Sequence, residues 1–191
     1  MVEEKQIDLN TDDKRRRTGT AVSVKGTTEG GGRAAGKPSR LSQVTSGETS
    51  RIDTGIGELN RVLGGGLVPG SLTLISGEPG IGKSTIIIQA AAHIAASKGT
   101  VLYVSGEESE EQIKIRADRV CDKLPEDLYI LAETNIDVIA EACQQLNPVF
   151  LIIDSIQTMY TSDIESAPGS VSQVRTCGNE LMRIGKMHGI P

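Results

Sequence analysis

A glycine-rich motif constrains this chain more than any other feature of its sequence. Residues Gly77–Thr85 read Gly-Glu-Pro-Gly-Ile-Gly-Lys-Ser-Thr and match the pattern G-x-x-x-x-G-K-[ST]. The apolar run Ser71–Ser76 before it predicts a strand, and Lys83–Ser97 after it predicts a helix. In that setting glycines let successive backbone N–H groups turn toward a phosphate, and the helix N-terminus adds positive potential. The motif therefore predicts a P-loop, and with it a site for ATP with Mg²⁺.

Each polar residue of this loop has an expected role. Lys83 is expected to neutralise the β- and γ-phosphates, which also makes it a candidate catalytic residue. Ser84 is expected to give its hydroxyl oxygen to Mg²⁺, and Thr85 to contact the α-phosphate. The predicted nucleotide-binding residues are Gly77, Glu78, Pro79, Gly80, Ile81, Gly82, Lys83, Ser84 and Thr85.

Acidic residues follow two other apolar runs. Val149–Ile153 predicts a buried strand that ends in Asp154, which we expect to hold Mg²⁺ through a water molecule. Glu107 and Glu108 come just after the predicted strand Val101–Ser105. We favour Glu107 as the acid that activates the attacking water, with Glu108 second. The alternative is that both are solvated acids at the start of a helix.

Predicted strands alternate with predicted helices along the rest of the chain. Because each strand is a near-continuous apolar run, the pattern predicts an α/β fold: a mostly parallel sheet with helices on both faces. Beyond the elements above, the predicted strand is Leu128–Leu131, and the predicted helices are Ile56–Leu63, Glu110–Val120, Asp137–Leu146 and Val171–Met187.

Composition narrows the class of protein further. The net charge of −5 provides no overall basic field, so DNA binding would have to come from local patches. No segment is apolar for long enough to span a bilayer and no signal-peptide core is present, so a cytoplasmic location is expected. Residues 1–40 are predicted to be a disordered basic, glycine-rich segment, either a solvated linker or an arm that touches phosphate; residues 41–191 are predicted to form the ATPase core.

Several short motifs resemble one known family. They are Thr54–Gly66, Val104–Ser109, Asp154–Thr158 and Ser166–Arg175. Together they resemble the bacterial RadA (or Sms) family of RecA-like ATPases, over about Leu41–Pro191. The position of Glu107 after the second strand agrees with the position of the catalytic acid in that family.

The resemblance implies a function and a set of partners. RadA-like proteins are hexameric, ATP-dependent DNA motors that extend strand exchange and process branched recombination intermediates. The implied partners are single-stranded or branched DNA, a recombinase and further copies of the chain. In the wider RecA class the loop after the metal-side strand contacts DNA, although a surface connection without a ligand is the alternative. Here the candidate residues are Gly169, Ser170, Ser172, Gln173 and Arg175.

The chain also departs from the family pattern. The four-cysteine zinc module that usually begins these proteins is absent, so no zinc is predicted. The later Lys-Asn-Arg-Phe-Gly motif and the Lon-protease-like domain are absent too. We therefore expect a chain truncated at both ends, with a sheet incomplete at its C-terminus. The alternatives to a DNA-dependent ATPase are a nucleotide-binding module without turnover, or another RecA-class ATPase of replicative-helicase-like or clock type.

Overall fold

The computed structural model of the protein describes residues 40–43 and 50–191. Leu41–Gln43 form a single turn of 3-10 helix, η1, and belong to a different unit of the chain from residues 50–191. The expectations for residues 1–39, including the disordered basic arm, lie outside the described residues. The domain boundary near residue 41 stays a prediction.

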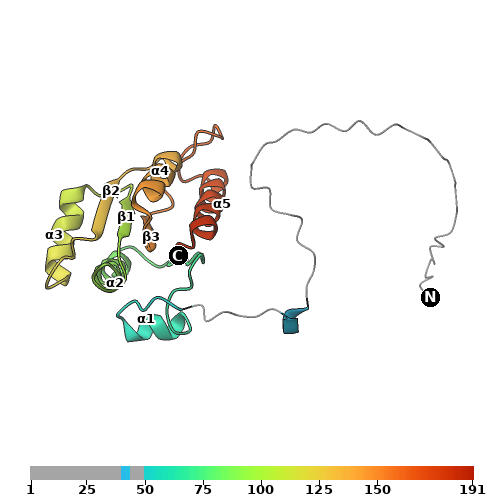
Figure 1. Cartoon of the computed structure of the whole chain (residues 1–191). Coiled ribbons are helices and arrows are strands. Elements are labelled where there is room, and N and C mark those ends of the chain that lie inside the picture. The colour runs from blue at the N-terminus through green and yellow to red at the C-terminus, as the bar shows by residue number, and fades with distance from the viewer. Residues whose placement is uncertain (1–39, 44–49) are drawn as a thin grey trace, which may run out of the picture. The chain divides into compact units, whose positions relative to one another are not determined.

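Residues 50–191 contain helices and strands in alternation (Figure 1). In chain order they are α1 (Gly57–Val62), α2 (Lys83–Ser97), β1 (Val101–Ser105), α3 (Glu110–Val120), β2 (Leu128–Ala132), α4 (Ile136–Leu146), β3 (Phe150–Asp154) and α5 (Val171–His188). All of these elements were predicted, with boundaries within one residue of those observed. No helix in the described ranges has the length and apolar character needed to cross a membrane.

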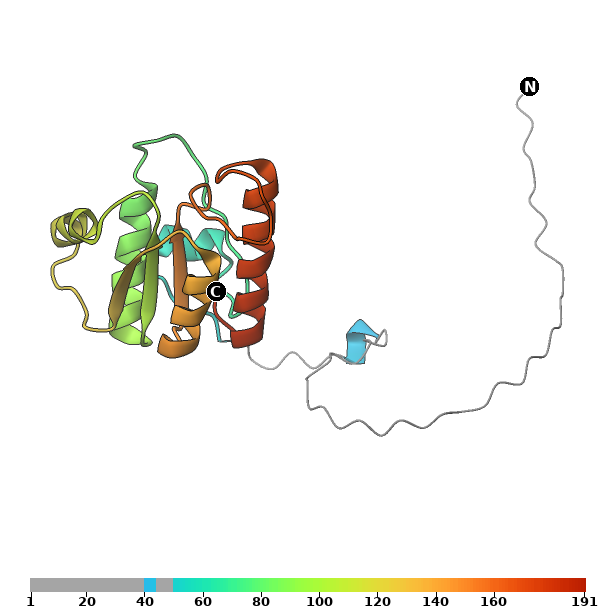
Figure 2. The ribbon, with the colours of Figure 1, turned by 90° about the horizontal axis from the view of Figure 1, so that it is seen from above.

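The three strands form one parallel sheet in the order β2-β1-β3. Every residue of the central strand, β1, is buried. Because successive strand residues face opposite sides, Val101 and Tyr103 pack against α2 and α3, whereas Leu102 and Val104 pack against α4 and α5. Figures 1 and 2 show these helix pairs on the two faces of the sheet. The predicted α/β fold, with helices on both faces of a parallel sheet, is confirmed.

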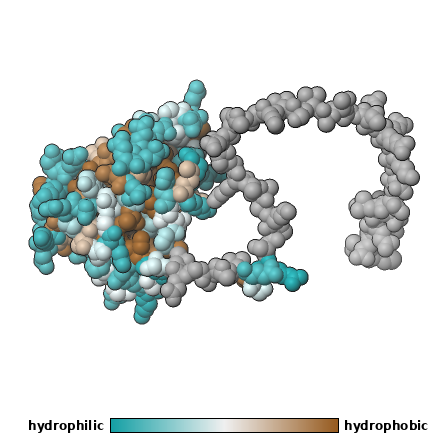
Figure 3. All heavy atoms as spheres, in the orientation of Figure 1, coloured by the Kyte–Doolittle hydropathy of each residue, from teal (hydrophilic) through white to brown (hydrophobic). Residues whose placement is uncertain are grey.

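One predicted strand is wrong. Ser71–Ser76 is not a strand, and its apolar side chains are exposed: Leu72 by 57%, Leu74 by 78% and Ile75 by 41%. No described strand lies beside this run to accept its backbone hydrogen bonds, and an isolated strand is not stable in water. The run arches out at the top of Figure 2 before it enters α2. Figure 3 shows apolar areas on the mainly hydrophilic surface of this unit.

The outer edge of β3 has few partners. β3 pairs with β1 on one side, in the register that sets Ser105 opposite Asp154. On its other side, among the described residues, one backbone hydrogen bond is made, from the Leu151 N–H to the Pro191 carbonyl at 3.1 Å. Because Ser105 pairs with Asp154, β1 and β3 stop at the same level at their carboxyl ends. The candidate site lies at this level edge.

Candidate active site

The predicted P-loop forms an exposed turn that leads directly into α2. Gly80 and Gly82 have φ angles of +78° and +100°, which other residues rarely adopt. No atom lies within 4 Å of where a Cβ would be at either glycine, so backbone conformation and not crowding requires glycine there. The Lys83 ammonium donates to the carbonyls of Gly77 at 2.8 Å and Glu78 at 2.9 Å. The Lys83 side chain thus contacts the backbone of the same loop that is expected to bind phosphate.

The first turn of α2 is suited to an anion. Its N-cap residue, Gly82, supplies no side-chain hydrogen bond, and the turn contains no acidic residue. The first backbone N–H groups of a helix have no partner within the helix, and its dipole places positive potential there. The hydroxyls of Ser84 and Thr85 make no hydrogen bond with any residue that the structure describes. This end of α2 therefore offers unused donors and a free hydroxyl oxygen.

The predicted acids gather at the level edge of β1 and β3. The Ser105 hydroxyl oxygen accepts from the backbone N–H groups of Glu107 at 3.4 Å and Glu108 at 3.0 Å. The Glu107 carboxylate accepts from the Ser155 hydroxyl at 2.6 Å. Because Ser155 directly follows Asp154, this hydrogen bond holds Glu107 next to the end of β3. The structure thus brings Glu107 and Asp154, which are far apart in the sequence, to one place.

Glu108 has a different partner from Glu107. Its carboxylate accepts from the Arg116 guanidinium at 2.6 Å, and the same guanidinium donates to the Tyr103 hydroxyl oxygen at 3.2 Å. The Tyr103 hydroxyl in turn donates to Oδ2 of Asp154 at 2.6 Å. Burial, and then the hydrogen bond to Asp154, raise the pKa of Tyr103, so its hydroxyl keeps its proton at neutral pH. Glu108 is therefore held in an ion pair with Arg116 of α3.

The loop after β3 places the candidate DNA-binding residues unequally. Gly169 and Arg175 are exposed. The Ser170 hydroxyl caps α5 by accepting from the Gln173 N–H at 3.3 Å, and the Ser172 hydroxyl donates to the Ser166 hydroxyl at 2.8 Å.

Gln173 is the exception in this group. Its side chain is 2% exposed, and its amide is occupied by the 161–166 segment. The amide oxygen accepts from the Thr161 N–H at 3.1 Å, and the amide nitrogen donates to the carbonyls of Thr161, Ile164 and Ser166. In this arrangement the side chain holds the loop together and is not available to a ligand.

A family model described as an AAA domain matches residues 37–190. The chain belongs to this AAA domain family. It is 55% identical over 155 residues to the DNA repair protein RadA of Bacillus subtilis, a match that covers 81% of this chain and 34% of that protein.

Other relatives of this AAA domain carry the same name. The DNA repair protein RadA of Halalkalibacterium halodurans is 53% identical, over 83% of this chain and 35% of its own length. The protein of that name from Listeria monocytogenes is 50% identical, over 81% of this chain and 34% of its own length. The chain thus spans about a third of the length of these curated relatives.

Sequence reasoning missed two polar residues of the AAA domain, Tyr103 and Arg116. Tyr103 is 1% exposed in a strand that is otherwise aliphatic up to its terminal Ser105. A buried hydroxyl normally has a hydrogen-bond partner, and Tyr103 lies two residues before the edge where the acids gather. That position is the signal from which a role of Tyr103 in the site could have been predicted. Arg116 had none, because its contact with Tyr103 depends on how α3 packs on the sheet.

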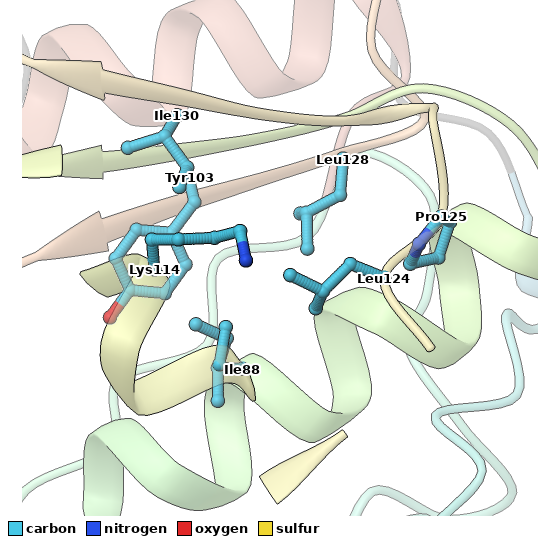
Figure 4. A pocket seen from close by; sticks show the side chains of 8 residues that line it. Ile88, Tyr103, Lys114, Leu124, Pro125, Leu128 and Ile130 are labelled. Atoms are coloured by element: carbon cyan, nitrogen blue, oxygen red, sulfur yellow. The ribbon is translucent and has the colours of Figure 1, made fainter. Parts of the chain in front are cut away.

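A small cavity lies beside Tyr103 (Figure 4). Its volume is about 210 Å³, and the Tyr103 ring forms part of its wall. The cavity lies between α2, α3 and the strands β1 and β2, and it contains no acidic residue. It is lined by Ile88, Tyr103, Lys114, Ala117, Leu124, Pro125, Leu128 and Ile130.

Proposed function

We propose that this chain is the ATP-binding part of a RadA-type DNA-repair ATPase that acts on single-stranded or branched DNA. The observation that carries the proposal is the motif Gly77–Thr85 at the start of α2, on the sheet face from which the side chain of Asp154 also emerges. The relatives named RadA support the choice among P-loop activities. Oligomerisation into a ring and contact with a recombinase are parts of the same proposal.

The residues fit a nucleotide with Mg²⁺. Lys83 would exchange its loop carbonyls for phosphate oxygens, and the uncapped N–H groups of α2 would donate to them. Ser84 and Asp154 would hold the metal, since both have an oxygen that accepts no hydrogen bond from the described residues. Bound Mg²⁺ neutralises charge that develops on the phosphates. Glu107 would orient and deprotonate the attacking water.

DNA contact is assigned to the loop that leads into α5. Exposed Gly169 and Arg175, with the Ser170 and Ser172 hydroxyls nearby, offer donors to phosphate groups. In this proposal Gln173 acts indirectly, by fixing the shape of the segment 161–166. We infer that a contact made mainly to the DNA backbone would show little sequence preference.

The proposal is tested by measuring ATP turnover with and without single-stranded DNA. We expect hydrolysis that DNA stimulates and that is lost in Lys83→Ala, because the lysine's charged contact with phosphate is removed. Lys114→Ala is the matched control, since Lys114 is an exposed lysine in an ion pair on α3. Equal turnover of Lys83→Ala and wild type would overturn the proposal.

A second candidate is a nucleotide-binding module without turnover. It is favoured by the exposed run Ser71–Ser76, because a loop anchored on an unpaired segment is less well fixed than one anchored on a strand. ATP binding without hydrolysis, unaffected by DNA, would favour this candidate over the ATPase.

A further inference from the structure

A series of hydrogen-bonded polar side chains ends on Asp154, and the proposed function does not use it. It runs from Glu108 through Arg116 to the Tyr103 hydroxyl and ends on Oδ2 of Asp154. Its residues come from three parts of the fold: the loop after β1, α3 and the central strand. Such a chain needs the full packing of α3 on the sheet, and it ends on the residue assigned to the metal.

The direction of these hydrogen bonds follows from the chemistry of the groups. A guanidinium can only donate and a carboxylate can only accept. Arg116 therefore donates to both Glu108 and the Tyr103 oxygen, and the Tyr103 proton must point to Asp154. Each bond polarises the next, since the positive guanidinium makes the phenol a stronger donor. The result is one well-defined donor aimed at one carboxylate oxygen.

Only one of the two oxygens of Asp154 is occupied. Oδ2 accepts from Tyr103, whereas Oδ1 accepts no hydrogen bond from the described residues. This hydrogen bond restricts rotation of the carboxylate and so limits the directions that its other oxygen can take. Tyr103 itself is nearly fully buried, and its backbone is paired on both sides within the sheet. The anchor is therefore more rigid than the carboxylate that it holds.

We propose that Tyr103, oriented by the Arg116–Glu108 pair, is a positioning residue that fixes the orientation of the Asp154 carboxylate, which would hold Mg²⁺. Glu108 then has a structural role in this chain and is not a second catalytic acid. The inference rests on the proposed function, because it assumes that Asp154 serves a nucleotide-bound metal. Outer hydrogen bonds of this kind commonly tune metal affinity without touching the metal.

The test measures Mg²⁺, separately from catalysis. Fluorescent ADP is titrated into the full chain in EDTA and at increasing Mg²⁺, which gives the gain in nucleotide affinity due to the metal. In Tyr103→Phe we expect the Mg²⁺ concentration for half of that gain to rise roughly tenfold, the low end of the effect of losing such a bond. Nucleotide affinity in EDTA should stay unchanged, since the P-loop is intact.

Three further variants make the result specific. Arg116→Met removes the donor to Tyr103 and should shift the Mg²⁺ midpoint in the same direction. Asp154→Asn should abolish the metal-dependent gain. Ile130→Val is the matched control, because Ile130 pairs in register with Tyr103 and lines the same cavity, but its aliphatic side chain makes no hydrogen bond with the polar groups. Its Mg²⁺ midpoint should equal that of the wild type, while thermal unfolding reports how much stability each variant has lost.

The outcomes separate the inference from the proposed function. If wild type shows no gain from Mg²⁺, both fail. If Asp154→Asn loses the gain while Tyr103→Phe and Arg116→Met keep the wild-type midpoint, only the positioning role is overturned. A shift in Ile130→Val as large as that in Tyr103→Phe also overturns it, because packing would then be the cause.

Discussion

At the scale of single residues, two neighbouring acids of the candidate site have different hydrogen-bond partners. Glu107 accepts from Ser155 beside the end of β3, whereas Glu108 is paired with Arg116. The two carboxylates, one residue apart, therefore have different partners: Glu107 contacts the residue that follows β3, and Glu108 contacts α3. The sequence pattern favours Glu107 as the catalytic acid and keeps Glu108 as second choice, and that choice stays a prediction.

The role of Glu107 leads to a prediction for turnover. In Glu107→Gln we expect nucleotide to stay bound and hydrolysis to slow by roughly 10²-fold or more, because the amide keeps the shape and can still accept from Ser155 but cannot take a proton. Steady-state phosphate release measures the rate, and an ADP titration measures binding. Glu110→Gln, an exposed acid in the first turn of α3, is the control. Turnover equal to wild type would move the role to another group.

At the scale of elements, local signals predicted most of the fold. Helix ends follow cap residues: Ser109 forms a capping box with Gln112, and Asn135 and Ser170 cap α4 and α5. The strand Ser71–Ser76 failed because strand formation needs a neighbour, and apolar composition does not say where a neighbour lies. The Tyr103–Asp154 contact was not predicted for a similar reason, since it joins residues far apart in the sequence.

The capping box at the start of α3 gives a prediction for stability. Ser109→Ala removes the hydroxyl that accepts from the Gln112 N–H, and should lower the free energy of unfolding by about 1 kcal/mol. Urea unfolding followed by circular dichroism measures the change. Ser97→Ala is the control, because its hydroxyl only donates to the His93 carbonyl within the last turn of α2. Equal loss in both variants would show that the capping box adds nothing specific.

At the scale of the whole molecule, the surface carries an apolar run that a folded protein normally covers. Leu72, Leu74 and Ile75 lie close together in the sequence and are all exposed. Contiguous exposed apolar surface favours association. We expect the triple change of these residues to serine to reduce concentration-dependent self-association, with the free energy of unfolding unchanged to within about 0.5 kcal/mol. Sedimentation velocity at increasing protein concentration measures the association.

The control for this prediction is a single exposed apolar residue elsewhere. Val171 is 84% exposed and belongs to another element, α5, so Val171→Ser should leave self-association as it is in the wild type. Self-association that persists in the triple variant would place the contact surface somewhere else on the molecule.

The central strand also has a consequence for how the molecule opens. β1 is buried along its whole length and is hydrogen-bonded on both sides, by β2 and by β3. Its amide hydrogens can meet solvent deuterium only when a neighbouring strand detaches. Their exchange rates therefore report the largest opening of this unit, and a bound nucleotide that slows them is acting on the whole sheet rather than on the loop that it touches.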